Sequence, residues 1–268
     1  MRTIFITGAS SGLGRACVKV FADKGWRVIA TMRNPAAGEE LGKLPNVHLK
    51  QLDVNNVPQL QALVKEVEDK WQVDVVLNNA GHILVGPLEG FTDEQVSLQV
   101  TTNLLGPIRV TKEFLPYFRE RKSGLFLNVT STGALLPEPF MSIYGATKAA
   151  IEAWSTSMRS ELSKVGIGIK TLIPDLMQTS FVANAQLILH PAYQEWVDKM
   201  LAIFSNPDSP LVYDDPAAVA TFVYNAAVDG SDQLHYLIGD NAIRTGATIE
   251  KEGVENVLNY KEKFYFSA

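Results

Sequence analysis

Short runs of apolar residues alternate with longer stretches of helical periodicity along most of the chain. Short apolar runs bounded by turn residues are typical of buried strands, and apolar positions spaced three and four apart are typical of helices. The runs predict strands at Thr3–Thr7, Arg27–Thr31, Val47–Leu52, Val73–Leu77, Leu125–Val129, Ile167–Ile173 and His235–Ile238. The longer stretches predict helices over Gly12–Lys24, Val57–Trp71, Asp93–Leu104, Pro107–Arg121 and about Ser142 to Val165.

Strands that alternate with helices predict parallel pairing, because parallel neighbours need crossover connections. The strands are apolar almost throughout, which predicts a sheet covered on both faces. We therefore expect an α/β fold with a doubly wound, mainly parallel seven-stranded sheet in one domain over residues 1–268. Residues 174–214 lack regular periodicity except for an amphipathic piece around Tyr193–Phe204, and we expect them to form a substrate loop or lid inserted into this domain.

Composition narrows the class of protein. The 268 residues carry a net charge of −5, and the sequence shows no basic face of the kind that binds nucleic acid. No nucleic-acid partner is therefore expected. Because Cys17 is the single cysteine, no intrachain disulfide can form. Cys17 lies in an apolar helical pattern, which predicts a small buried side chain. No apolar run reaches the roughly 18 residues of a membrane span, and the N-terminus leaves no room for a signal peptide. We expect a cytoplasmic protein without a membrane partner.

A glycine-rich turn lies between the first strand and the first helix, with the sequence TGASSGLG at residues 7–14. Gly8 permits a tight turn, while Gly12 and Gly14 allow the backbone to approach a pyrophosphate and the helix to pack closely. The helix N-terminus adds unpaired N–H groups and a favourable dipole. The turn predicts a dinucleotide site that includes Ser10, Ser11 and Leu13.

The spacing of these glycines resembles the short-chain dehydrogenase/reductase family. Two further motifs strengthen the resemblance, the NNAG sequence at residues 78–81 and the YGATK sequence at residues 144–148. The resemblance implies that Asn79, Ala80 and Gly81 border the cofactor, and that Asp53 and Val54, after the third strand, contact its adenine.

The end of the second strand indicates which cofactor binds. In dinucleotide folds an acidic residue there accepts hydrogen bonds from the ribose of NAD, and a basic residue accommodates the 2′-phosphate of NADP. Here Met32 occupies the acidic position and Arg33 follows it. A guanidinium can bind the phosphate through two hydrogen bonds, and Ser11 can add a hydroxyl donor. The pattern predicts NADP(H), although Arg33 can also be read as a solvated surface arginine.

Tyr144 and Lys148 stand four positions apart, so they share one face of a helix. A free tyrosine has a pKa near 10, which is unsuited to proton transfer at neutral pH. An ammonium group one turn away stabilises the phenolate and is expected to lower that pKa toward neutrality. Taken alone, such a pair is more often an exposed helix surface.

The resemblance supplies the other catalytic roles. It implies that Ser131 orients the substrate oxygen, that Tyr144 transfers the proton, and that Lys148 also binds the nicotinamide ribose. Asn103 matches the family's fourth catalytic residue, which holds a water that passes protons to Lys148; it can equally be a helix breaker before Gly106. The implied reaction interconverts a ketone or aldehyde and an alcohol by hydride transfer.

The loop after the sixth strand departs from the family pattern. Thr179 matches the threonine that contacts the nicotinamide carboxamide, and Met177 would offer its backbone. Asp175 stands where the family has glycine. A carboxylate near the nicotinamide and an ordinary surface aspartate both remain open, and the second is favoured.

Several alternatives remain. The small-molecule substrate is expected to be a medium-sized apolar carbonyl compound or alcohol, as for a carbonyl reductase, and a hydroxysteroid or retinol-type dehydrogenase is the alternative. A protein that senses NADP(H) without catalysis is a second class. The four histidines show no metal-ligand spacing, so no metal is expected. A homodimer or homotetramer through the helices of Asn103 and Tyr144 follows from the resemblance. Apolar side chains predicted for the pocket or lid are Leu135, Leu136, Phe140, Phe181, Leu187, Tyr193, Trp196 and Phe204.

Overall fold

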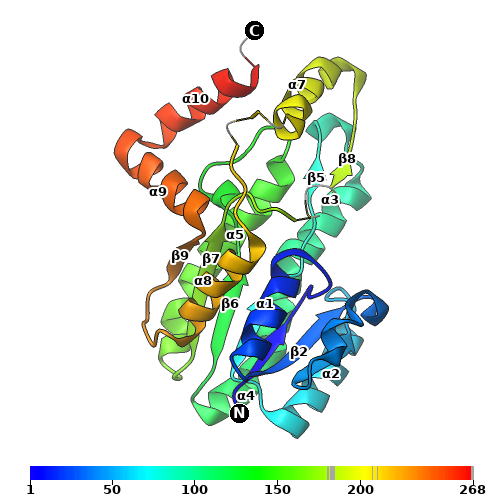
Figure 1. Ribbon diagram of the computed structural model, residues 1–268, viewed down its shortest axis with the longest axis vertical. Coiled ribbons are helices and arrows are strands. Elements are labelled where there is room, and N and C mark those ends of the chain that lie inside the picture. Colours follow the sequence, from blue (N-terminus) through cyan, green and yellow to red (C-terminus); the bar gives the residue numbers. More distant parts are fainter. Residues whose placement is uncertain (180, 182–184, 207, 210, 267–268) are drawn as a thin grey trace.

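Seven strands form the central sheet in the computed structural model, which describes residues 1–179, 181, 185–206, 208–209 and 211–266 (Figure 1). The strands are β1 (Thr3–Ile6), β2 (Arg27–Met32), β3 (Val47–Gln51), β4 (Val75–Asn78), β6 (Leu125–Val129), β7 (Gly168–Pro174) and β9 (His235–Ile238). Their order is β3-β2-β1-β4-β6-β7-β9, and every neighbouring pair is parallel. The doubly wound parallel sheet predicted from the sequence is confirmed.

Helices cover both faces of the sheet (Figure 1). The helices of the described residues are α1 (Gly12–Asp23), α2 (Val57–Trp71), α3 (Asp93–Val100), α4 (Gly106–Arg121), α5 (Ser142–Ser163), α7 (Gln194–Ser205), α8 (Pro216–Val228), α9 (Asp240–Glu252) and α10 (Val254–Phe266). Helices α1 and α8 pack on the face to which Ile4 and Ile6 point. Helices α2, α4 and α5 pack on the opposite face, against Phe5. No helix in the described part of the chain is long and apolar enough to cross a membrane.

The order of the strands reverses between β1 and β4. From β1 the chain winds outward to β2 and β3, then returns to pair β4 with the other edge of β1. The carboxyl ends of β1 and β4 therefore diverge into connections on opposite faces, which leaves a crevice above them. The glycine turn follows β1 and the NNAG motif follows β4, so the fold brings both motifs to this crevice.

The helix predicted over Asp93–Leu104 is only partly α-helical. Helix α3 ends at Val100, and residues Thr101–Leu105 form a π-helical turn before α4. Pro107 lacks the N–H that would bond to the Asn103 carbonyl in a continuous α-helix, so the ladder must change its spacing there. The side chain of Asn103 is engaged elsewhere, as described below.

The last third of the chain holds most of the elements that the pattern does not predict. Strands β5 (Leu84–Val85) and β8 (Gln186–Leu187) form a separate parallel pair, too short to show alternation. Helix α7 matches the amphipathic piece around Tyr193–Phe204. Helices α9 and α10 bury only two residues each, Asn241 with Ala242 and Val257 with Tyr265, so they add little to the core that the sequence pattern reveals.

A buried lysine secures β7, the strand that leads to the loop at Asp175. Lys170 is 4% exposed, and its ammonium donates to the Ala226 carbonyl at 2.8 Å and to the Asp229 carboxylate at 2.5 Å. Desolvation alone would raise the pKa of Asp229, but hydrogen bonds from Lys170, Tyr236 and Ser231 outweigh it and lower that pKa to about 2. The ion pair therefore stabilises the fold above the ordinary carboxyl pKa, and this contribution is lost as the pH falls toward about 2.

We predict that Asp229→Asn lowers the free energy of unfolding by about 1–3 kcal/mol, because Lys170 loses its countercharge while remaining buried. Urea unfolding near pH 7 measures the difference, which should shrink as the pH approaches the folded pKa of Asp229. Asp232→Asn is the matched control, because the Asp232 side chain is 98% exposed and lies in the same loop. Equal stabilities for the two variants would contradict the prediction.

Candidate active site

The glycine turn after β1 has the geometry of an anion site. Gly8 and Gly12 have φ angles of +67° and +54°, a region that side chains rarely adopt. Helix α1 starts at Gly12 after the N-cap residue Ser11, whose side chain makes no capping hydrogen bond in the structure. The first turn also carries no acidic residue, so its backbone N–H groups face the cavity without a side-chain acceptor.

Close packing explains the third glycine. A Cβ atom on Gly14 would lie against the carbonyl oxygen of Gly8 and 2.5 Å from Nδ2 of Asn79. That amide nitrogen donates to the carbonyls of Thr7 and Gly8 at 2.9 and 3.0 Å. The hydroxyl of Thr7 accepts the N–H groups of Asn79 and Ala80, each at 3.0 Å. These bonds tie the glycine turn to the end of β4.

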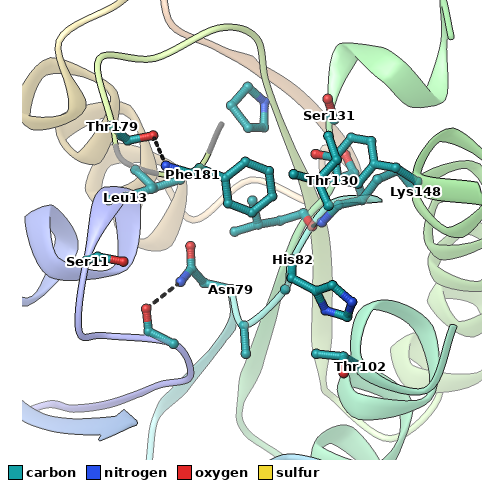
Figure 2. A pocket seen from close by; sticks show the side chains of 18 of the residues that line it. Ser11, Leu13, Asn79, His82, Thr102, Thr130, Ser131, Lys148, Thr179 and Phe181 are labelled. Atoms are coloured by element: carbon teal, nitrogen blue, oxygen red, sulfur yellow. Dashed lines mark hydrogen bonds between the residues drawn. The ribbon is translucent and has the colours of Figure 1, made fainter. Parts of the chain in front are cut away.

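A cavity of about 620 Å³ extends from this turn to the first turns of α5. In Figure 2, Ser11 and Leu13 lie at one side of it and Ser131 and Lys148 at the other. The predicted site residues on its wall are Gly8, Ser10, Ser11, Gly12, Leu13, Arg33, Asp53, Val54, Asn79, Ala80, Gly81, Ser131, Tyr144, Lys148, Met177 and Thr179. A dinucleotide site and a proton-transfer pair therefore share one cavity.

Two predicted residues lie behind this wall. Gly14 supports the turn, as described. Asn103 is 2% exposed, and its amide accepts the N–H of His82 at 3.0 Å and donates to the His82 carbonyl at 2.8 Å. The structure thus assigns Asn103 a direct bond to the loop after β4, and its role in proton relay stays a prediction.

Met32, the last residue of β2, and Arg33, which follows it, differ in exposure. Met32 is 3% exposed and fills the position where an acidic residue would meet a ribose. Arg33 is exposed and lines the cavity. One oxygen of Asp53 accepts the N–H of Asn55 at 2.9 Å, which fixes the turn after β3. A cationic side chain and an uncharged neighbour suit a phosphorylated ribose.

Helix α5 presents Tyr144 and Lys148 to the other end of the cavity. The Lys148 ammonium is 5.7 Å from the centre of the Tyr144 ring and donates to the Val129 carbonyl at 2.8 Å. Ser131 lies two residues beyond Val129, and its hydroxyl accepts the N–H of Gly133 at 3.0 Å. The Ser131 hydroxyl also lies near the Tyr144 side chain and acts to lower the pKa of its phenol. The three groups therefore converge from the end of β6 and the first turns of α5.

The pKa of Tyr144 differs from the expectation that Lys148 lowers it toward neutrality. Burial raises the pKa of Tyr144 to about 12, against the opposing hydrogen bond from Ser131, and the Asp175 carboxylate raises it further. Burial lowers the pKa of Lys148 to about 8, while Glu152 opposes that change. In the protein alone the pKa of Tyr144 moves away from neutrality, because desolvation of the phenol outweighs the groups that lower it. The phenol is held as a proton donor.

Asp175 belongs to the cavity wall, contrary to the favoured surface interpretation. One of its oxygens accepts the hydroxyl of Thr245 on α9 at 2.8 Å, and the other accepts the N–H of Leu176 at 2.8 Å. Both bonds hold the carboxylate at the start of the loop after β7. An aspartate in place of glycine therefore connects this loop to α9.

Only part of the predicted apolar pocket reaches the cavity. Phe181 and Phe204 line it, and the Phe181 ring centre is 6.1 Å from that of Tyr144. Leu136 is 1% exposed in the interior, whereas Leu135, Leu187 and Trp196 are largely exposed. Sequence reasoning missed the cavity residues His82, Ile83, Met141 and Gln186. The position of His82 directly after the NNAG motif is the one signal that would have indicated it.

The histidines are separate from one another. His48 stacks on Trp71 with ring centres 4.4 Å apart, and His190 caps the short helix at Pro191–Tyr193. His235 contacts Glu152. Within the described residues no group of three or more His, Cys, Asp or Glu side chains could hold a metal ion.

The sequence of this chain is similar to a known protein family and to individual proteins. A family model described as short chain dehydrogenase matches residues 2–187. An uncharacterized oxidoreductase of Schizosaccharomyces pombe is 33% identical over 223 residues, which cover 79% of this chain and 90% of the relative.

Solved structures give the same picture. A short-chain dehydrogenase from Streptomyces avermitilis is 30% identical, with a TM-score of 0.84 over 98% of this chain and 96% of that one. A closed form of serine dehydrogenase complexed with NADP+ is 26% identical, with a TM-score of 0.75 over 87% of this chain and 94% of that one. The family model, which matches residues 2–187, includes both the glycine turn and the first turns of α5.

We predict that Gly14→Ala lowers the free energy of unfolding by about 1–3 kcal/mol, because the new Cβ overlaps backbone and the clamping amide of Asn79. Helix propensity alone would favour alanine by about 1 kcal/mol, so a loss isolates the steric effect. Gly246→Ala in α9 is the control, since its Cβ would meet the tip of the Leu237 side chain, which can rotate away. Chemical unfolding compares the stabilities of the two variants. A Gly14→Ala protein as stable as wild type would show that Gly14 is not closely packed against Gly8 and Asn79.

Proposed function

The chain belongs to the short-chain dehydrogenase family, and from that membership we propose that it is an NADP(H)-dependent carbonyl reductase for apolar ketones or aldehydes. It is an oxidoreductase acting on CH–OH groups. The observation that carries the proposal is the single cavity that joins the glycine turn to Ser131, Tyr144 and Lys148. A dinucleotide held at one end would present its reactive ring to a proton donor at the other.

The residues of the chain divide the chemistry among them. When bound, the reduced nicotinamide would supply the hydride that a carbonyl carbon accepts. Tyr144 holds its proton at neutral pH because burial raises its pKa to about 12, and it can give that proton to the developing alkoxide. Ser131 lies near the phenol and would orient the same oxygen. Lys148 stands behind both and would bind the ribose and stabilise the resulting phenolate.

Preference for NADP(H) rests on the end of β2. Buried Met32 leaves no carboxylate to repel a 2′-phosphate, and exposed Arg33 supplies a guanidinium on the cavity wall. The similar serine dehydrogenase structure, which contains NADP+, supports the same choice. Asp53 and Val54 would border the adenine, and Thr179 and Met177 the carboxamide.

Apolar substrates are favoured by the walls beside Tyr144. Ile83, Met141, Phe181 and Phe204 surround that end of the cavity. Residues 174–214 contribute Phe181 and Phe204, which supports their proposed role as a substrate loop. We also propose a cytoplasmic homodimer or homotetramer joined through the helices near Asn103 and Tyr144.

Tyr144→Phe tests the mechanism. We expect carbonyl-dependent oxidation of NADPH, followed at 340 nm with a panel of apolar ketones and aldehydes, to fall by about 10²–10⁴-fold, because the proton donor is lost. NADPH affinity, measured by fluorescence, should change little. Tyr260→Phe is the control, since Tyr260 is 67% exposed on α10. NADPH binding without turnover in wild type would instead favour the sensor, and an active Tyr144→Phe enzyme would exclude this mechanism.

Arg33→Ala tests the cofactor. A charge-assisted hydrogen bond contributes about 1.5–3 kcal/mol, so kcat/KM with NADPH should fall by about 10–100-fold while that with NADH is nearly unchanged. Steady-state kinetics with both cofactors give the ratio. Arg159→Ala serves as the control, because Arg159 is a half-exposed residue near the far end of α5. A parallel loss with both cofactors would show that Arg33 does not read the phosphate.

A further inference from the structure

One turn beyond Lys148, α5 carries a glutamate that the proposed chemistry does not use. The side chain of Glu152 is 13% exposed, so its carboxylate is largely withdrawn from solvent. A carboxylate in such a position needs partners for its oxygens. Glu152 finds them on elements that are distant in the sequence.

Three strands supply these partners. One carboxylate oxygen accepts the hydroxyl of Thr130, directly after β6, at 2.5 Å. The other accepts the hydroxyl of Thr171 on β7 at 2.9 Å and lies 2.8 Å from Nδ1 of His235 on β9. Thr130 and Thr171 are 1% and 0% exposed, so their hydroxyls depend on acceptors within the protein. Glu152 therefore fixes α5 against three neighbouring strand positions.

Thr130 connects Glu152 to the active site, because its chain neighbours contact Lys148 and Tyr144. It stands between Val129, whose carbonyl accepts a hydrogen bond from the Lys148 ammonium, and Ser131, whose hydroxyl lies near the Tyr144 side chain. Its backbone N–H also donates to the Leu172 carbonyl at 2.8 Å. A displacement of α5 relative to Thr130 would therefore change the position of Lys148 and Tyr144 relative to Ser131 in one movement.

We propose that Glu152 is a positioning residue for catalysis, which aligns the Tyr144–Lys148 pair with Ser131 and supplies a negative charge one turn of α5 away from Lys148. This inference rests on the proposed function, because it assumes that these three groups perform the reaction. Glu152 touches neither substrate nor cofactor, since the cavity wall is made by its neighbours.

The charge has a direct consequence for Lys148. Glu152 raises the pKa of Lys148 against the stronger effect of burial, and the result is about 8. The titratable groups that contact Glu152 or lie one turn away are Lys148 on α5 and His235 on β9; Thr130 and Thr171 contribute neutral hydroxyls. Loss of the carboxylate should therefore lower the pKa of Lys148 further.

Two substitutions separate charge from geometry. Glu152→Gln keeps the length of the side chain and removes the charge, whereas Glu152→Asp keeps the charge and shortens the reach. Glu161→Gln is the matched control, because Glu161 is exposed on the same helix. The measurements are kcat, KM for NADPH, and the pH profile of kcat/KM for the best carbonyl substrate.

For Glu152→Gln we expect kcat to fall by roughly 10-fold or more while KM for NADPH changes little, since misplacement of reacting groups by about 1 Å costs up to about 100-fold. The alkaline limb of the profile should move to lower pH. Glu152→Asp should lose kcat with the alkaline limb in place, and Glu161→Gln should match wild type. A Glu152→Gln enzyme that is less stable but has the kcat and pH profile of wild type would overturn the proposal.

A second readout does not require activity. Because folding lowers the pKa of Lys148 from 10.5 to about 8, the folded state releases this proton first, and the stability of wild type relative to Lys148→Met should rise between those pH values. In the Glu152→Gln background the rise should begin at lower pH. An unchanged onset would overturn the charge assignment. If wild type reduces no carbonyl compound, the proposed function fails, and this measurement still decides whether Glu152 acts on Lys148.

Discussion

Parallel pairing on both sides of β1 is the constraint on which the rest of the structure depends. Because β2 and β4 both run parallel to β1, their carboxyl ends reach one edge of the sheet. The glycine turn, Arg33 and Asn79 all follow these ends within a few residues. Bonds from Thr7 and Asn79 then fix the spacing between the turn and β4. The site is thus a product of topology, and its side chains refine an arrangement that the backbone has already made.

The sequence predicts this framework well because its signals are local. Leu125–Val129 and His235–Ile238 have the predicted bounds, and α2 covers the predicted Val57–Trp71. The motifs at residues 7–14, 78–81 and 144–148 stand at fixed positions after strands or on a helix, so their convergence follows from the parallel sheet. Sixteen of the predicted site residues line one cavity for that reason.

Features that depend on distant contacts were not predictable in the same way. The side chain of Asn103, in the π-helical turn, bonds to the backbone of His82, and no local pattern encodes that partner. The pKa of Tyr144 rises because the fold buries the phenol, whereas spacing to Lys148 alone indicates the opposite direction. Asp175 reads as a surface residue until α9 brings Thr245 to it. Burial and long-range partners are tertiary properties.

The carboxylate of Glu152 also bears on how this sequence can diverge. The Glu152 carboxylate accepts hydrogen bonds from the buried hydroxyls of Thr130 and Thr171 and contacts the His235 imidazole. An apolar residue at position 152 would remove this acceptor from both hydroxyls. Substitutions at positions 130, 152, 171 and 235 are therefore energetically coupled, although the chain separates the outermost two by more than a hundred residues. Descendants that lose the acid are expected to change its hydroxyl partners as well, so that the four positions evolve as one unit.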